Sequence, residues 1–72
     1  MRYILITFYN RGTQDRPIWE VYGHKGKYNN DLIKGFGNEQ DAMFEAHGYC
    51  LPVMRGTSNS MEISKMLDLL DT

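Results

Sequence analysis

The sequence contains little cysteine and no long apolar run, and each shortage excludes a class of protein. Its single cysteine, Cys50, excludes an internal disulfide. No segment approaches the ~20 consecutive apolar residues of a membrane-spanning helix. The start also lacks the charged region followed by an apolar one that marks a signal peptide. We therefore expect a soluble protein with no membrane contact, working in a reducing compartment such as the cytoplasm.

Proline and low-complexity segments are also scarce. The chain has two prolines in 72 residues, and neither an internal repeat nor a linker divides it. A domain of this length lies near the lower limit at which a hydrophobic core alone offsets chain entropy. Residues 1–72 are therefore expected to form a single α+β domain. A deep cleft of the ~300–1,000 Å³ typical of small-molecule sites is hard to build at this size.

The net charge is small, but the charged residues are unevenly distributed along the chain. A formal net charge of −1 argues against a dedicated duplex-binding protein, because such proteins neutralise many phosphates with Lys and Arg. Residues 1–36 contain six basic and three acidic side chains, a balance of +3. Residues 37–72 contain two basic and six acidic ones, a balance of −4. The molecule is therefore expected to be dipolar.

Catalytic and metal-binding motifs are missing as well. The best candidates for a nucleophile or a soft-metal ligand are His24, His47 and Cys50, and a structural zinc site usually needs four ligands. The glycine- and lysine-containing loops at residues 23–27 and 34–37 lack the spacing of a nucleotide-binding fingerprint. We expect no catalytic residue, no metal and no cofactor, so the protein is not expected to be an enzyme. Cys50 is expected to be a small buried hydrophobe.

The sequence does contain β-prone segments followed by helical ones. Asn38 is a good helix N-cap, and Gly48 is a natural helix stop. Pro52 restricts its segment to the edge of a sheet, because proline has no backbone N–H to donate. The predicted elements are strands at 3–9 and 18–24, a helix at 39–48, an edge strand or extended segment at 49–54 and a helix at 60–71. Residues 31–36 can form a short third strand, and the sequence leaves this open. The predicted fold is α+β of order ββ(β)αβα, a small antiparallel sheet packed on one face by two helices.

One face of the predicted sheet is rich in aromatic and basic side chains. Alternation along the first strand places Ile4, Ile6 and Phe8 on the core face and Tyr3 with Tyr9 on the opposite face. The candidate binding residues of this aromatic and basic face are Tyr3, Tyr9, Tyr22, His24, Lys25, Lys27 and Tyr28. Such a face can stack single-stranded bases or form a protein-binding hot spot. Alternatively, the closing helix or a homodimer covers it.

The first predicted helix offers a second candidate surface. Its acidic side chains Glu39, Asp41 and Glu45 form a face that could dock on a basic groove of another protein, or could be an ordinary solvated surface. Phe44 lies off the apolar stripe of this helix. We expect it either to cover the edge of the core or to be offered to a partner.

The closing helix carries more apolar side chains than one narrow stripe requires. The surplus could bind a second copy of the chain. The residues considered for this contact are Leu67, Leu69 and Leu70.

Two sequence segments support a resemblance to known modules. Trp19-Glu20-Val21 and Lys34-Gly35-Phe36-Gly37-Asn38-Glu39-Gln40-Asp41-Ala42 resemble a pattern in which a W-x-V strand is followed by a GF turn and an acidic helix start. The arm-type DNA-binding domains of phage integrases and the hybrid-binding domain of some ribonucleases H look like this. Here the helix is acidic and dense basic residues are missing, which departs from a nucleic-acid-binding pattern.

The whole chain is also similar to small phage-encoded orphan proteins that inhibit host machinery, of the anti-CRISPR or anti-restriction type. This similarity lies in small size, lack of catalytic motifs and charge asymmetry. It implies action in the host cytoplasm.

These observations lead to one main functional hypothesis and two alternatives. The main hypothesis is a non-catalytic binding protein that inhibits or modulates a larger host protein or nucleoprotein complex by stoichiometric contact. The first alternative is a single-stranded nucleic-acid-binding module that uses the aromatic and basic face. The second is a small self-associating structural subunit, which would form a homodimer or a larger assembly.

Overall fold

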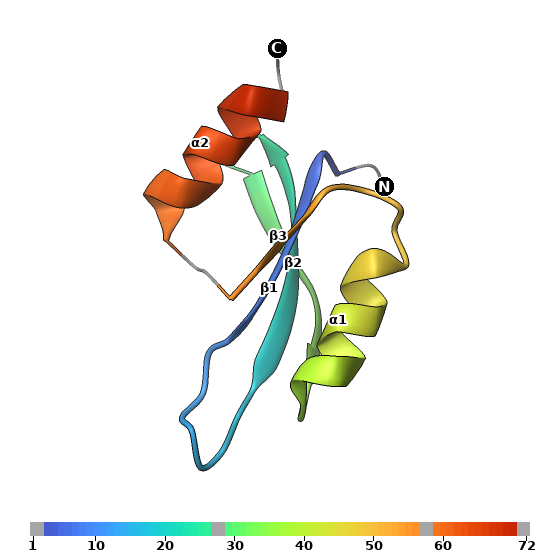
Figure 1. Cartoon of the computed structure of the whole chain (residues 1–72), viewed down its shortest axis with the longest axis vertical. Helices are drawn as coiled ribbons and strands as arrows, with labels where there is room; N and C mark the ends of the chain where they lie inside the picture. The colour runs from blue at the N-terminus through green and yellow to red at the C-terminus, as the bar shows by residue number, and fades with distance from the viewer. Residues whose placement is uncertain (1–2, 27–28, 57–58, 71–72) are drawn as a thin grey trace.

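The computed structural model describes residues 3–26, 29–56 and 59–70. The elements within these residues are β1 (Leu5–Asn10), β2 (Trp19–Gly26), β3 (Asn29–Phe36), α1 (Glu39–His47), β4 (Val53–Arg55) and α2 (Ser60–Leu70). The strands form one sheet in the order β3-β2-β1-β4 (Figure 1). The predicted α+β class and the predicted order of strands and helices are confirmed. The sequence left open whether residues 32–36 form a strand, and in the structure they belong to β3.

The sheet is mixed, whereas the sequence predicted an antiparallel one. β2 pairs antiparallel with both β1 and β3, but β4 runs parallel to β1 and places Val53 opposite Ile6. The helix between β3 and β4 explains this direction. Because α1 carries the chain back along the sheet, β4 runs in the same direction as β3. β3 and β1 are both antiparallel to β2, so β4 is also parallel to β1.

One face of the sheet forms the main core with α1. Ile6 and Phe8 of β1 and Val21 of β2 are buried there against Ala42 and Ala46 of α1. The two alanines have the smallest side chains of this cluster, so the helix can lie close to the strands. Trp19 packs against this core, with its ring centroid 6.1 Å from that of Phe8.

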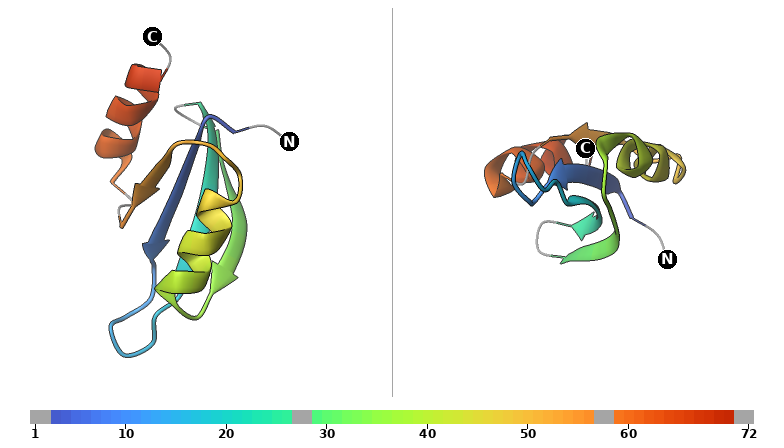
Figure 2. Two further views of the ribbon diagram at one scale, coloured as in Figure 1. Left: turned by 45° about the vertical axis from the view of Figure 1, so that its right-hand side comes forward. Right: turned by 90° about the horizontal axis from the view of Figure 1, so that it is seen from below.

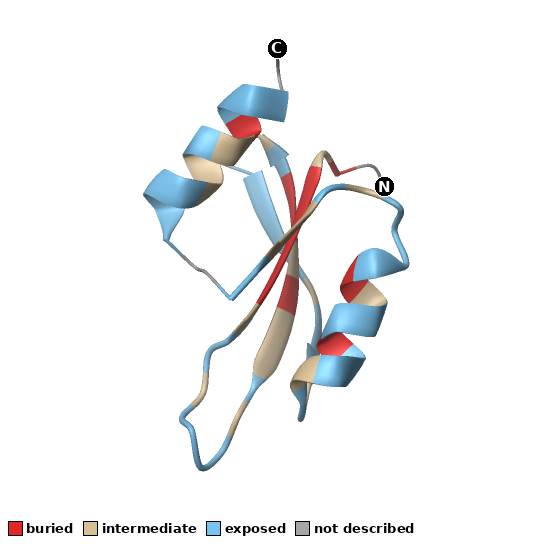
Figure 3. Cartoon of the chain, viewed as in Figure 1, coloured by how far each residue is buried: buried red, intermediate tan, exposed pale blue. Residues whose placement is uncertain are grey.

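The opposite face of the sheet is covered in part by α2. Leu5 and Thr7 of β1 are fully buried, as is Leu67 of α2. Figures 1 and 2 show the two helices on opposite faces of the sheet, so the prediction that both pack on one face is wrong. The physical reason is that β1 is central and carries uncharged side chains on both faces, so each face needs a covering layer. Figure 3 shows the buried residues concentrated along β1 and β2.

Tyr3 lies on the α1 face, and its predicted position beside Tyr9 is wrong. The chain bends at Ile4, just before β1, and this bend breaks the alternation that the sequence pattern assumed. The Tyr3 ring lies directly over Gly23 of β2, where a Cβ atom would approach the ring to 2.6 Å. The Tyr3 side chain is only 5% exposed and belongs to the main core cluster.

The loop between β1 and β2 is held by the side chain of Asn10. Its Oδ1 accepts hydrogen bonds from the backbone N–H of Gly12 at 2.9 Å and of Ile18 at 3.0 Å. A Cβ atom on Gly12 would overlap the carbonyl oxygen of Arg16, so glycine is required at this close approach. The hairpin is therefore ordered where it leaves β1, and this fixes the position of Arg11.

An asparagine caps the start of each helix, and the cap at Asn38 was predicted. Oδ1 of Asn38 accepts a hydrogen bond from the backbone N–H of Asp41 at 2.8 Å, and Oδ1 of Asn59 accepts one from Met61 at 2.9 Å. Gly48 ends α1, as predicted. Neither of the two helices within the described ranges is long and apolar enough to cross a membrane.

Cys50 is exposed, so the prediction that it is a buried hydrophobe is wrong. It lies in the turn between α1 and β4 with a φ of 57°. A left-handed backbone of this kind belongs to turns that run over the surface. The apolar side chain that packs against the core in this segment is Leu51.

Candidate functional site

The outer surface of α1 carries the most exposed aromatic side chain that the structure describes. Phe44 is 84% exposed, whereas Ala42 and Ala46 of the same helix are fully buried against the sheet. Met43 is also exposed. The expectation that Phe44 covers the edge of the core is therefore wrong, and the other expectation, that it is offered to a partner, stays open.

Two shallow depressions lie on either side of Phe44. One has a volume of about 310 Å³ and is lined by Met43, Phe44, His47 and Gly48. The other has a volume of about 290 Å³ and is lined by Phe36, Asp41, Phe44 and Glu45. We define the Phe44 surface as Asp41, Met43, Phe44, Glu45 and His47. It is an apolar centre with carboxylates along one side.

The three acidic residues predicted to share one face divide into two groups. Asp41 and Glu45 lie one helical turn apart and line the same depression beside Phe44. Glu39 instead pairs with Arg55 of β4, where its carboxylate accepts from the guanidinium. The structure therefore brings Asp41 and Glu45 to the Phe44 surface, while Glu39 ties the first turn of α1 to the sheet edge.

The aromatic and basic face is not one open surface. Tyr9 of β1 and Tyr22 of β2 are half-buried and stack on each other, with ring centroids 5.6 Å apart and planes 9° from parallel. His24 is only 3% exposed. These three side chains do share the face of the sheet on which α2 lies, as the alternation predicted.

The remaining members of that predicted face lie elsewhere. Tyr3 is in the α1 core, and its hydroxyl donates to Oδ2 of Asp31 at 3.3 Å. Nζ of Lys25 lies 3.6 Å from the same carboxylate oxygen and 5.4 Å from the centroid of the Tyr3 ring. Lys27 and Tyr28 lie outside the described residues. The structure therefore separates Tyr3 and Lys25 from Tyr9, Tyr22 and His24.

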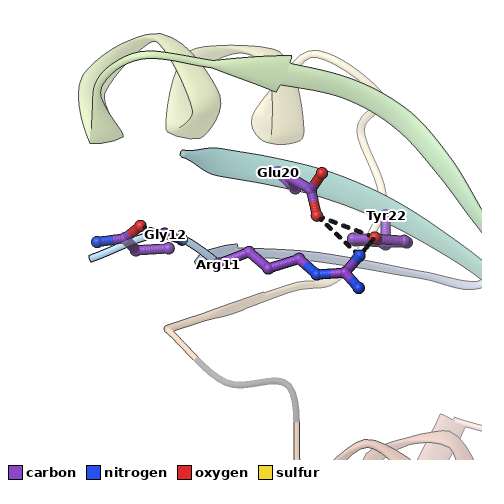
Figure 4. Close-up of polar contacts among 5 residues, drawn as sticks. Arg11, Gly12, Glu20 and Tyr22 are labelled. Atoms are coloured by element: carbon purple, nitrogen blue, oxygen red, sulfur yellow. Dashed lines mark hydrogen bonds and ion pairs between the residues drawn. The ribbon is translucent and has the colours of Figure 1, made fainter. Parts of the chain in front are cut away.

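A polar network from the hairpin lies along the α2 side of the sheet. The guanidinium of Arg11 donates to the Tyr22 hydroxyl oxygen at 3.0 Å and to Oε1 of Glu20 at 3.4 Å, and the Tyr22 hydroxyl donates to the same Glu20 oxygen at 3.0 Å. Figure 4 shows these three side chains pointing toward one another. The hydrogen bonds to Tyr22 and Glu20 raise the pKa of Arg11. Burial, followed by the hydrogen bond to Glu20, raises the pKa of Tyr22.

Arg11 and Tyr22 of this network line a cavity of about 390 Å³ between the sheet and α2. We call it the α2 cavity. Its lining residues are Thr7, Tyr9, Arg11, Tyr22, His24, Asn30 and Ile63. The sequence predicted Tyr9, Tyr22 and His24 as one group but missed Arg11, Asn30 and Ile63, because they come from a loop, from β3 and from α2. Strand pairing brings Asn30 opposite His24, and no local sequence pattern reports that pairing.

His24 forms the buried floor of the α2 cavity. Its Nε2 lies 3.0 Å from the hydroxyl oxygen of Thr7 in a hydrogen bond. Its Nδ1 is buried and has no hydrogen-bond partner of standard geometry among the described residues. Burial lowers the pKa of His24, and an interaction with the Asn30 side chain opposes that shift. The ring is therefore held in its neutral form near neutral pH.

No family model, curated protein or solved structure matches this chain. Within residues 3–26, 29–56 and 59–70, no group of three or more His, Cys, Asp or Glu side chains is placed to hold a metal ion. The candidate sites are therefore defined by geometry alone, and they are the Phe44 surface and the α2 cavity.

Proposed function

We propose that this protein is a non-catalytic binding protein that contacts a larger host protein or nucleoprotein complex through the Phe44 surface. The observation that carries the proposal is the 84% exposure of Phe44 in a helix whose opposite side is fully packed. Burying such an aromatic side chain in a partner is worth about 1.5–3 kcal/mol. Large aromatic side chains are also enriched among the residues that dominate binding energy at interfaces.

The chemistry of the Phe44 surface indicates the chemistry of its partner. Phe44 and Met43 supply an apolar centre, while Asp41 and Glu45 place two carboxylates beside it. The complementary surface is an apolar pocket with Lys or Arg along one side, since such charges steer association and fix the orientation of the complex. Inhibition or modulation of the partner, and action in the cytoplasm, are parts of the proposal that rest on the resemblance to small phage-encoded inhibitors.

A quantitative pull-down tests the proposal. The tagged protein is incubated with nuclease-treated lysate from the source cell or its host, and recovered proteins are measured by mass spectrometry. Phe44→Ser should lower recovery of the partner at least tenfold, consistent with losing about 1.4 kcal/mol or more of binding free energy. Reversing the charges of Asp41 and Glu45 to Lys should lower recovery as well.

Leu69→Ser is the matched control, because Leu69 is 70% exposed but lies on α2. This variant should recover the partner normally. Equal recovery by the Phe44 and Leu69 variants would contradict the proposal. Circular dichroism of both variants tests whether each remains folded.

The two alternatives predict other outcomes of the same experiment. A single-stranded nucleic-acid binder would lose its partners on nuclease treatment, and its affinity for oligonucleotides would fall with salt. Self-association through α2 would show as a concentration-dependent mass in sedimentation. Since Leu67 is fully buried, that contact would depend on Leu69 and Leu70.

A further inference from the structure

We infer that the α2 cavity is a binding site for a small organic monocarboxylate with an apolar body. The cavity has a volume of about 390 Å³, which lies at the lower end of the ~300–1,000 Å³ range of small-molecule sites. Ile63 of α2 is one of its lining residues, and α1 and α2 lie on opposite faces of the sheet (Figures 1 and 2), so this site is separate from the Phe44 surface.

Arg11 supplies the charge that selects an anion. It is the only charged side chain among the described residues that line the cavity. Nη1 donates to Tyr22 and Glu20, and no described residue accepts a hydrogen bond from Nη2 or Nε. The side chain is also 65% exposed. Because a guanidinium presents its donors as a planar fork, Arg11 can offer a paired contact to a carboxylate.

The charge around Arg11 favours a monoanion over a phosphate. Glu20 already lies 3.4 Å from the Arg11 guanidinium and offsets part of its charge. A dianion would therefore meet one cation and a nearby carboxylate. Ile63 and the rings of Tyr9 and Tyr22 supply apolar surface to the same cavity. A carboxylate attached to an apolar body fits this combination.

His24 forms the uncharged floor of the site. Only 3% of the residue is exposed, and it lines the cavity. Burial lowers the pKa of His24, so the ring is neutral near neutral pH and adds no second cation beside Arg11. Arg11 therefore supplies the one positive charge that a ligand would meet among the described residues of this cavity.

Titration by nuclear magnetic resonance tests the site, with sodium benzoate as the probe. Benzoate should give saturable shifts confined to Arg11, Tyr22, His24, Asn30 and Ile63. Benzamide has the same shape without the charge and should bind at least about tenfold more weakly. Inorganic phosphate should also bind more weakly than benzoate. Shifts that do not saturate or that scatter over the surface would overturn the proposal, as would equal binding of benzoate with either comparison compound.

Substitutions in the hairpin loop separate a specific site from general attraction of anions. Arg11→Gln should weaken benzoate binding at least about tenfold, and Arg11→Lys should weaken it less because the charge remains. Arg16→Gln is the matched control, since Arg16 is an exposed arginine of the same loop and does not line the cavity. Equal effects of Arg11→Gln and Arg16→Gln would overturn the proposal.

Discussion

Gly23 shows how a single hydrogen atom in place of a side chain shapes the core. The ring of Tyr3 occupies the space that a Cβ would need, with three ring atoms within 2.7 Å of that position. The clash involves the base of the ring, which cannot move without disturbing the core. We predict that Gly23→Ala lowers the free energy of unfolding by about 1–3 kcal/mol, as measured by urea denaturation.

Gly26 of the same strand provides the control. A Cβ there would meet nothing within 4 Å, so Gly26→Ala should be neutral or slightly stabilising, because alanine restricts the unfolded chain. Equal destabilisation by both substitutions would mean that general strand effects, rather than the Tyr3 contact, explain the loss.

His24 makes a second prediction at the level of one residue. Its pKa is lowered by burial in the folded state, so below about pH 6.5 the unfolded chain binds more protons than the folded one. The free energy of unfolding should therefore decrease as the pH falls from about 6.5 toward the lower folded pKa. Each unit by which the pKa is lowered corresponds to about 1.4 kcal/mol.

Denaturation at a series of pH values, with wild type and His24→Gln compared, measures this loss. The substitution should remove the part of the decrease that begins near pH 6.5. His47→Gln, at an exposed position, should retain it. An unchanged pH profile in the His24 variant would show that protonation of this ring does not limit stability.

At the level of elements, α1 depends on its N-cap. Asn38 accepts from the backbone N–H of Asp41, and its Nδ2 donates to the Asp41 carboxylate at 2.9 Å. We predict that Asn38→Ala lowers the free energy of unfolding by about 0.5–2 kcal/mol. Asn38→Ser keeps an acceptor and should lose only a small part of that. Thermal denaturation of both variants measures the difference, and identical losses would contradict a capping role.

The same element shows what the sequence could and could not predict. Asn38, the acidic first turn and Gly48 are local signals, and they predicted the start and end of α1 correctly. The orientation of Tyr3 and the exposure of Cys50 depend on a bend and on a left-handed turn. Neither feature has a local signature in the residues around it. Extending the alternation of β1 through the bend therefore placed Tyr3 on the wrong face of the sheet.

At the level of the whole molecule, the unpredicted feature was the division into layers. Both helices contain apolar residues, but no periodicity predicts which face of a sheet a helix will cover. Arg11, Asn30 and Ile63 illustrate the consequence, because three separate elements meet only once α2 lies over the second face. The α2 cavity was therefore beyond sequence reasoning, although three of its side chains were correctly placed together.

Stability should also be uneven across these layers. α1 packs on the cluster that contains Ile6, Phe8 and Val21, whereas in α2 only Leu67 is buried among the described residues. We predict that the amide hydrogens of α2 exchange through a local opening that leaves β1 and β2 intact. Native-state hydrogen exchange should then show protection in α2 that is lower than in the two central strands.

Leu67→Ala separates this local opening from global unfolding. Truncating a buried leucine costs about 2–5 kcal/mol when its packing is part of the global unit. If α2 opens separately, the substitution can remove no more than the free energy by which α2 packs on the sheet. Hydrogen-exchange protection should then fall in α2, while β1 and β2 keep theirs. Ile6→Ala, in the core beneath α1, should lower protection in both central strands and in α1. Loss of protection throughout the sheet in the Leu67 variant would instead show that α2 and the sheet unfold as one unit, because only shared packing transmits the deletion to the far side of β1.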